Sequence, residues 1–163
     1  MRAACFGLVA ALAVLGCSTQ HYSGNVYDDG NLRFRTGAVP PAWHPIEADG
    51  TLIAFRDDEH GATVAVNGRC GIDGDDVPLP SLTQHLFLQF TEREQKSQQE
   101  LMLDGRAALR TDLVGKLDGV PRRFLVYVLK KDGCVYDFWR ISEPGTDDSA
   151  AFESFVKGFS TES

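Results

Sequence analysis

The sequence predicts an α+β domain, in which a twisted antiparallel sheet with a C-terminal four-stranded meander packs against two helices. Three observations predict this class. Asp-Gly pairs at 104–105, 118–119 and 132–133 each separate two stretches of strand-like composition, and Asp-Gly is a preferred turn sequence of tight hairpins. Two other segments place apolar side chains at helical spacing. The last two strand-like stretches are apolar on both sides, so helices must cover at least one face of the sheet.

Short strand-like segments fill the first half of the chain and lead into a helix. The expected strands are 32–35, 43–48, 52–56 and 63–70. Pro78 and Pro80 mark the start of the helix, because proline is favoured in a first helical turn. Its apolar positions are Leu82, Leu86, Phe87 and Phe90. We expect this helix to end within 91–96.

The Asp-Gly turns define the meander and the element that closes the chain. The four expected strands are 98–103, 106–117, 120–131 and 134–142. A closing helix follows, with Asp147 or Asp148 as its cap and a stripe of Phe152, Phe155, Val156 and Phe159. We expect Gly158 to lie inside its final turn. No internal repeat or low-complexity segment is evident.

The N-terminus has the pattern of an export signal. Arg2 precedes an apolar run over 3–15 that is too short to span a bilayer. The run ends in Val14-Leu15-Gly16-Cys17, which resembles the lipobox of bacterial lipoproteins. The resemblance implies a signal peptide over 1–16, removed before Cys17, and a lipid on the Cys17 thiol that anchors the protein in a membrane. Ser18, in place of aspartate, favours the outer membrane, on its periplasmic face.

Behind the lipid, residues 17–30 are polar and turn-rich, so we interpret them as a tether to one domain over 31–163. The signal holds one of the 16 basic residues and none of the 23 acidic ones, which leaves the mature chain strongly acidic. Nucleic acid is therefore excluded as an expected partner. The basic pairs 122–123 and 130–131 are interpreted as solvated strand ends rather than as a binding patch.

Two cysteines remain for the domain, because Cys5 lies in the signal and Cys17 carries lipid. We predict that Cys70 and Cys134 form a disulfide, as an oxidising compartment permits. The alternative is a pair of separate buried thiols. A metal site is not expected at either cysteine, because no histidine or second cysteine lies at ligand spacing.

Candidate catalytic and metal-binding residues are few. The four histidines are too far apart in sequence for a zinc pattern. The acidic run 73–76 fails the pattern of a calcium loop and is interpreted as solvated. Asp137 is a carboxylate inside a doubly apolar strand, so we expect a partner for it, with Arg140, Arg122 and Arg110 as the candidates. No cofactor motif is present.

The order of elements and the ending from Val135-Tyr136 to Ser154-Phe155 resemble PsbP-like domains over about residues 31–160. Those domains likewise end in a tyrosine-bearing strand, a Pro-Gly loop and a helix with a phenylalanine stripe. The resemblance implies a binding or assembly role at a membrane surface, without catalysis. It transfers no site residues.

Three functions remain open. The first hypothesis is a non-enzymatic, lipid-anchored module that binds or assembles a protein complex of the cell envelope. The second is a carrier of a lipid or another apolar ligand, which requires a deep apolar cavity between sheet and helix. The third is a small hydrolase with a site built from His44, His85 and Asp137, which fails if those side chains lie more than about 10 Å apart.

Overall fold

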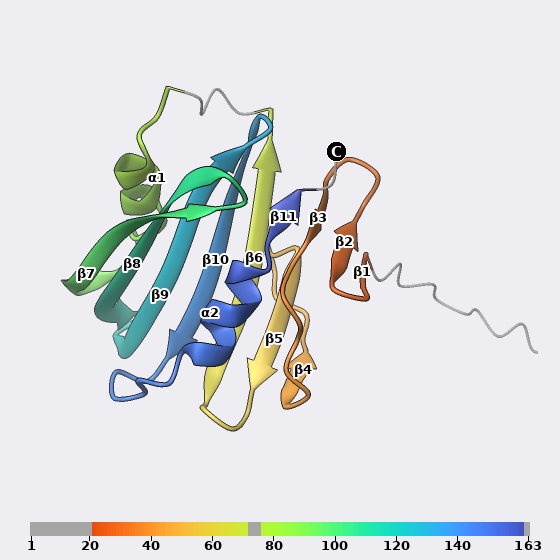
Figure 1. Ribbon diagram of the computed structural model, residues 1–163. Helices are drawn as coiled ribbons and strands as arrows, with labels where there is room; N and C mark the ends of the chain where they lie inside the picture. Colours follow the sequence, from red (N-terminus) through yellow and green to blue (C-terminus); the bar gives the residue numbers. More distant parts are fainter. Residues whose placement is uncertain (1–20, 72–75, 162–163) are drawn as a thin grey trace, which may run out of the picture.

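The computed structural model describes residues 21–71 and 76–161, which form two antiparallel sheets and two helices (Figure 1). The larger sheet has seven strands in the order β4-β5-β6-β10-β9-β8-β7. Its strands are β4 (Trp43–Pro45), β5 (Ile53–Asp57), β6 (Ala62–Cys70), β7 (Thr91–Leu103), β8 (Arg106–Leu117), β9 (Val120–Lys131) and β10 (Cys134–Ser142). The fold class predicted from the sequence is therefore confirmed.

The meander matches the prediction closely, because its turns fix the register. Strands β8, β9 and β10 have the expected bounds. The aspartate and glycine of each turn have positive φ, for example 50° at Asp118 and 79° at Gly119. This backbone conformation is that of a type I′ turn, whose twist fits the flanking strands. Strand β7 begins seven residues earlier than expected, at Thr91 rather than Gln98.

The smaller sheet corrects the predicted tether. Its strands, in the order β1-β2-β3-β11, are β1 (Tyr22–Ser23), β2 (Val26–Asp28), β3 (Arg33–Arg35) and β11 (Ser160–Thr161). We expected 17–30 to lack regular structure, whereas β1 and β2 form a hairpin that pairs with β3. Tyr27 on β2 is only 4% exposed and its ring stacks on Phe34. Regular structure is therefore already present at Tyr22, eight residues before residue 30.

Two cores lie on opposite faces of the larger sheet. Along β9, Leu125, Tyr127 and Leu129 enter one core, and Phe124, Val126 and Val128 enter the other. This alternation confirms that the central strands are buried on both faces. The first core also contains Phe34 of the smaller sheet and Phe152 of α2, so both of these elements cover that face.

Helix α2 (Ala150–Lys157) fits the predicted closing helix. Phe152, Phe155 and Val156 are each at most 1% exposed. The N-cap residue is Ser149 rather than the expected Asp147 or Asp148, although the N–H of Ala150 donates to Asp148 Oδ1 at 3.2 Å. Gly158 is the residue that ends the helix, one position beyond its last turn. A Cβ on Gly158 would lie 2.3 Å from Gly37 Cα. Glycine is therefore needed for the close approach of α2 to the chain after β3.

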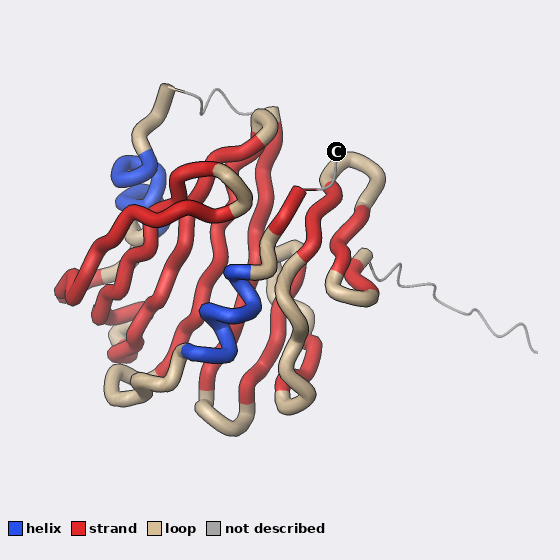
Figure 2. The backbone as a smooth tube through the Cα atoms, in the orientation of Figure 1, coloured by secondary structure: helices blue, strands red, loops and turns tan. Residues whose placement is uncertain are grey.

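Helix α1 (Leu79–Leu86) covers the other face, over β8 and β9. It ends at Leu86, earlier than the predicted range of 91–96, and Phe87 and Phe90 lie in the turn that follows. Both rings still enter the second core, where Phe90 stacks on Phe124 at a centroid distance of 4.3 Å. Figure 2 shows how little of the fold is helical. Among the described residues, no helix is long and apolar enough to cross a membrane.

Candidate functional site

The predicted lipidation site, Cys17, lies outside the described residues, and so does most of the acidic run 73–76. The predicted disulfide is present: Cys70 at the end of β6 is bonded to Cys134 at the start of β10. The two residues are direct partners across the antiparallel pair. The N–H of Gly71 also donates to the Gly133 carbonyl at 3.2 Å, so both chain segments are held together at this end of the sheet.

The hydrolase hypothesis is wrong, because its three residues do not meet. His44 lies on β4, at one edge of the larger sheet, and its Nε2 is 3.6 Å from Asp58 Oδ2. His85 lies on α1, which packs over β8 and β9 near the opposite edge. Neighbouring strands are about 4.8 Å apart, so β4 and β9 are separated by roughly 19 Å. No shared reaction centre can form from these side chains.

Asp137 has partners other than those expected. The carboxylate is 1% exposed and accepts hydrogen bonds from Asn67 Nδ2 at 2.7 Å and from Trp139 Nε1 at 2.5 Å. Arg69 Nη2 lies 3.7 Å from Asp137 Oδ2. These groups lie on the α1 face of the sheet. The cluster is a structural pairing of a buried charge, as the burial of a carboxylate requires.

The prediction that Asp137 pairs with Arg140, Arg122 or Arg110 is therefore wrong. Arg110 and Arg140 lie on the opposite face of the sheet, where Arg110 pairs with Glu153 of α2 at 2.9 Å. Arg122 lies six residues along β9 from Val128, the partner of Asp137, which is about 20 Å in a strand.

A network of charges lies at the N-terminal end of α2. Arg123 contacts both oxygens of Asp112, at 3.0 and 2.7 Å, and also bonds Asp147 before α2. Its side chain is only 22% exposed, so the expected solvated strand end is wrong for Arg123. Arg140, which is 3% exposed, donates from Nη1 to Ser142 Oγ at 3.0 Å. Burial lowers the pKa of Arg140, and the nearby Asp57 opposes that effect.

His60 joins two parts of this network. Its Nδ1 is 2.9 Å from Asp57 Oδ2 and its Nε2 is 3.4 Å from Asp148 Oδ2. Asp57 belongs to β5, and Asp148 lies just before α2, so the imidazole bridges the β5–β6 hairpin and the helix. The hydrogen bond with Asp57 raises the pKa of His60 above its ordinary value.

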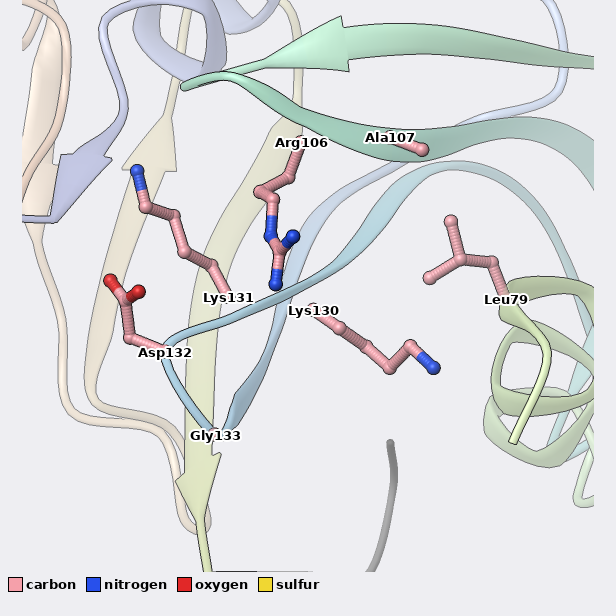
Figure 3. Close-up of a pocket in the computed structure, with 7 residues that line it drawn as sticks. All are labelled: Leu79, Arg106, Ala107, Lys130, Lys131, Asp132 and Gly133. Carbon is pink, nitrogen blue, oxygen red and sulfur yellow. The ribbon is translucent and has the colours of Figure 1, made fainter. Parts of the chain in front are cut away.

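A cleft of about 480 Å³ opens at the other end of the sheet and is the best candidate for a binding site. We call it the basic cleft. It is lined by Leu79, Arg106, Ala107, Lys130, Lys131, Asp132 and Gly133. The register of β8 and β9 accounts for this grouping: Ala108 is paired with Leu129, so the start of β8 lies beside the end of β9. Figure 3 shows Lys130 extending toward α1, and Arg106 extending from β8 toward the turn between β9 and β10.

The cations of the basic cleft differ in their contacts. Lys130 Nζ donates to the Val77 carbonyl at 2.9 Å, which ties the segment before α1 to β9. Lys131 turns away from α1 and bonds both the carbonyl and the carboxylate of Asp104. Arg106 is exposed, and within residues 21–71 and 76–161 its guanidinium has no hydrogen bond or ion pair.

Sequence reasoning missed Arg106 and took Lys130 and Lys131 for solvated residues. A usable signal was present, since a two-residue turn at 118–119 sets the pairing of the whole hairpin. Counting outward from that turn brings Arg106 opposite Lys131 and Ala107 opposite Lys130. The turn after Leu103 and the turn after Lys131 then lie at the same end of the sheet.

No protein-family model matches this sequence. No curated protein matches it either. Solved structures do match the fold. The solution structure of cyanobacterial PsbP (CyanoP) from Synechocystis sp. PCC 6803 aligns with a TM-score of 0.59 and 16% identity, over 84% of this chain and 91% of that one.

Two further structures share the fold. LpqN, described as involved in cell envelope biogenesis of Mycobacterium tuberculosis, aligns with a TM-score of 0.51 and 14% identity, over 82% of this chain and 87% of that chain. A crystal structure from Bacteroides thetaiotaomicron aligns with a TM-score of 0.57 and 10% identity over 80% of this chain. The match spans only 45% of the Bacteroides protein. The chain therefore has a PsbP-like α+β fold.

Proposed function

We propose that this chain is a lipid-anchored envelope lipoprotein whose PsbP-like domain is a non-enzymatic module for binding or assembling an envelope protein complex. The observation that carries the proposal is the similarity of fold to CyanoP and to LpqN, the latter described as an envelope biogenesis protein. The sequence Val14-Leu15-Gly16-Cys17 supports lipid attachment. Ser18 supports the outer membrane as the location.

The packing of the domain favours a rigid module over the carrier of an apolar ligand. A carrier needs a cavity between sheet and helix. In this position the rings of Phe55, Trp43 and Phe155 contact one another, with centroid distances between 5.5 and 6.1 Å. Phe138 and Phe159 fill the next part of the same interface, 5.3 Å apart. The described cleft lies elsewhere, and three basic side chains line it.

Lipid attachment is tested first, by expressing the full chain in a bacterium and measuring the mass of the mature N-terminal peptide. We expect a peptide beginning at Cys17 with acyl chains on the thiol, and membrane binding that detergent releases. Cys17→Ala should abolish both. Cys5→Ala is the matched control, because it removes a cysteine of the signal and should change neither. Membrane binding that persists in Cys17→Ala, without added acyl mass in the wild type, contradicts the anchor.

The binding role is tested by mild cross-linking in the native envelope, followed by purification of the chain and identification of what comes with it. We expect one protein at near-stoichiometric yield with the wild type and a large loss of it with Cys17→Ala. Bound lipid without a protein contradicts the assembly role and supports a carrier. Recovery of neither also contradicts the proposal.

A further inference from the structure

The outer edge of β7 differs from the other edge of the larger sheet in being open to a further strand. We propose that this edge is an interface between two copies of the chain, whose β7 strands pair antiparallel about a twofold axis. The two larger sheets would then form one continuous sheet. The proposal goes beyond the assembly role described above and does not depend on the lipid anchor.

The two edges of the sheet are protected to different degrees. Strand β4, at one edge, has three residues, and one of them is Pro45, which has no N–H to offer a further strand. Strand β7 has 13 residues and contains neither proline nor glycine. Within residues 21–71 and 76–161, β7 pairs only with β8, and Figure 1 shows it as the outermost strand. A long edge of this kind presents a row of unpaired N–H and C=O groups.

Most of β7 has no packing role within one chain. Every residue over 91–100 is exposed, although successive side chains of a strand point to opposite faces. None of these ten residues belongs to either core. The stretch is therefore held by its backbone bonds to β8, and a strand on its outer side would satisfy the remaining backbone groups.

The Asp-Gly turn between β7 and β8 determines which backbone groups point outward. Leu103 and Arg106 flank this two-residue turn, so they form a hydrogen-bonded pair, and such pairs alternate along the ladder. The pairing is regular from Ser97 to Leu103, because the bulges of β7 lie before Ser97. The residues that direct their N–H and C=O groups away from β8 are Gln98, Glu100 and Met102.

The order of charges along β7 matches a second copy of the same strand. With Gln98 on the twofold axis, Lys96 of each copy lies opposite Glu100 of the other, which gives two pairs of opposite charge. An axis at Lys96 or at Glu100 would instead place like charges opposite each other. In the single chain Lys96 Nζ lies 2.6 Å from Glu94 Oε1, with side chains 46% and 68% exposed. Such an exposed pair contributes little, so Lys96 can turn to the other copy.

The first test places a cysteine on β7 of the full chain and treats bacterial membranes that contain it with a mild oxidant. In the proposed register the two copies of residue 98 form a hydrogen-bonded pair with Cα atoms about 5.5 Å apart, which is within disulfide range. Gln98→Cys should therefore give a disulfide-linked dimer. Met102→Cys is the matched control, because Met102 is exposed on the same edge but its two copies would lie roughly 27 Å apart. It should not cross-link.

The second test exchanges the charges. Lys96→Glu and Glu100→Lys each place like charges opposite each other and should lower the affinity of the dimer roughly tenfold. The double variant restores opposite charges and should restore the affinity. Sedimentation equilibrium of the full chain in a density-matched non-ionic detergent measures these affinities. Both residues are exposed, so all three variants should unfold at the wild-type temperature.

Three results would each overturn the proposal. The first is a wild-type chain that stays monomeric at every concentration. The second is equal cross-linking of Gln98→Cys and Met102→Cys, because contact would then not depend on the register. The third is a double charge variant that associates no more tightly than the two single variants.

Discussion

Removal of the disulfide is the change whose effect on stability follows most directly from the structure. The double variant Cys70→Ser/Cys134→Ser opens a covalent link between residues separated by 64 positions. In the chain-entropy account, a loop of this length restricts the unfolded chain by about 4 kcal/mol. Cys70 is exposed, whereas Cys134 is 8% exposed and lies in the first core, so the change at Cys134 adds a smaller packing loss to that of the cross-link.

The expected effect is a large fall in the melting temperature of the full chain. For a protein of this size, 1 kcal/mol corresponds to roughly 2–4 °C, so the loss should be on the order of 10 °C. Thermal unfolding followed by circular dichroism measures it. A reductant should lower the melting temperature of the wild type by a similar amount and leave the double variant unchanged. A fall of less than about 3 °C would refute the reasoning, because the paired strands would then hold this end without the bond.

Two other predictions concern the packing of α2. The pKa of His60 is raised in the folded protein, so the stabilisation by His60 is complete below the unfolded pKa of about 6.5 and is lost as pH rises through the folded pKa. Between about pH 6 and pH 8, the wild type should therefore lose more stability than His60→Gln. Urea unfolding at each pH measures this difference. Gly158→Ala would push a methyl group against Gly37, 2.3 Å away, and should lower stability by about 3 kcal/mol. Gly145→Ala, where a Cβ meets nothing within 4 Å, is the control in the same assay, and equal stability of the two variants would contradict the close approach.

The part of the fold predicted from sequence is the part that local chemistry determines. Each Asp-Gly turn needs positive φ at two consecutive residues, and this requirement fixes both the turn and the register beside it. Strands β8, β9 and β10 were therefore predicted to the residue. The apolar stripe of the closing helix was also predicted, because its phenylalanines recur at helical spacing. Each of them is buried in the structure.

The missed elements lack such local signals. Residues 91–100 of β7 are exposed on both faces, so no alternation of polar and apolar residues marks the strand. Strands β1, β2 and β11 have two or three residues each, which is too short for a period. They form because Tyr27 stacks on Phe34 and because β11 pairs with β3, contacts that are distant in sequence. The Asp137 partners were missed for the same reason, since Asn67 belongs to β6.

With the proposed lipid on Cys17, the early start of the small sheet would limit how far the domain can stand from a membrane. A tether over 17–30 would reach about 45 Å when extended, which would let the domain search a wide volume. The hairpin of β1 and β2 already begins at Tyr22, so only the residues between Cys17 and this strand would connect the lipid to the domain. Their span is at most about 18 Å. A lipid on Cys17 would therefore keep the β1–β2 end close to the bilayer. An envelope partner would then have to bind the domain within a short distance of the membrane.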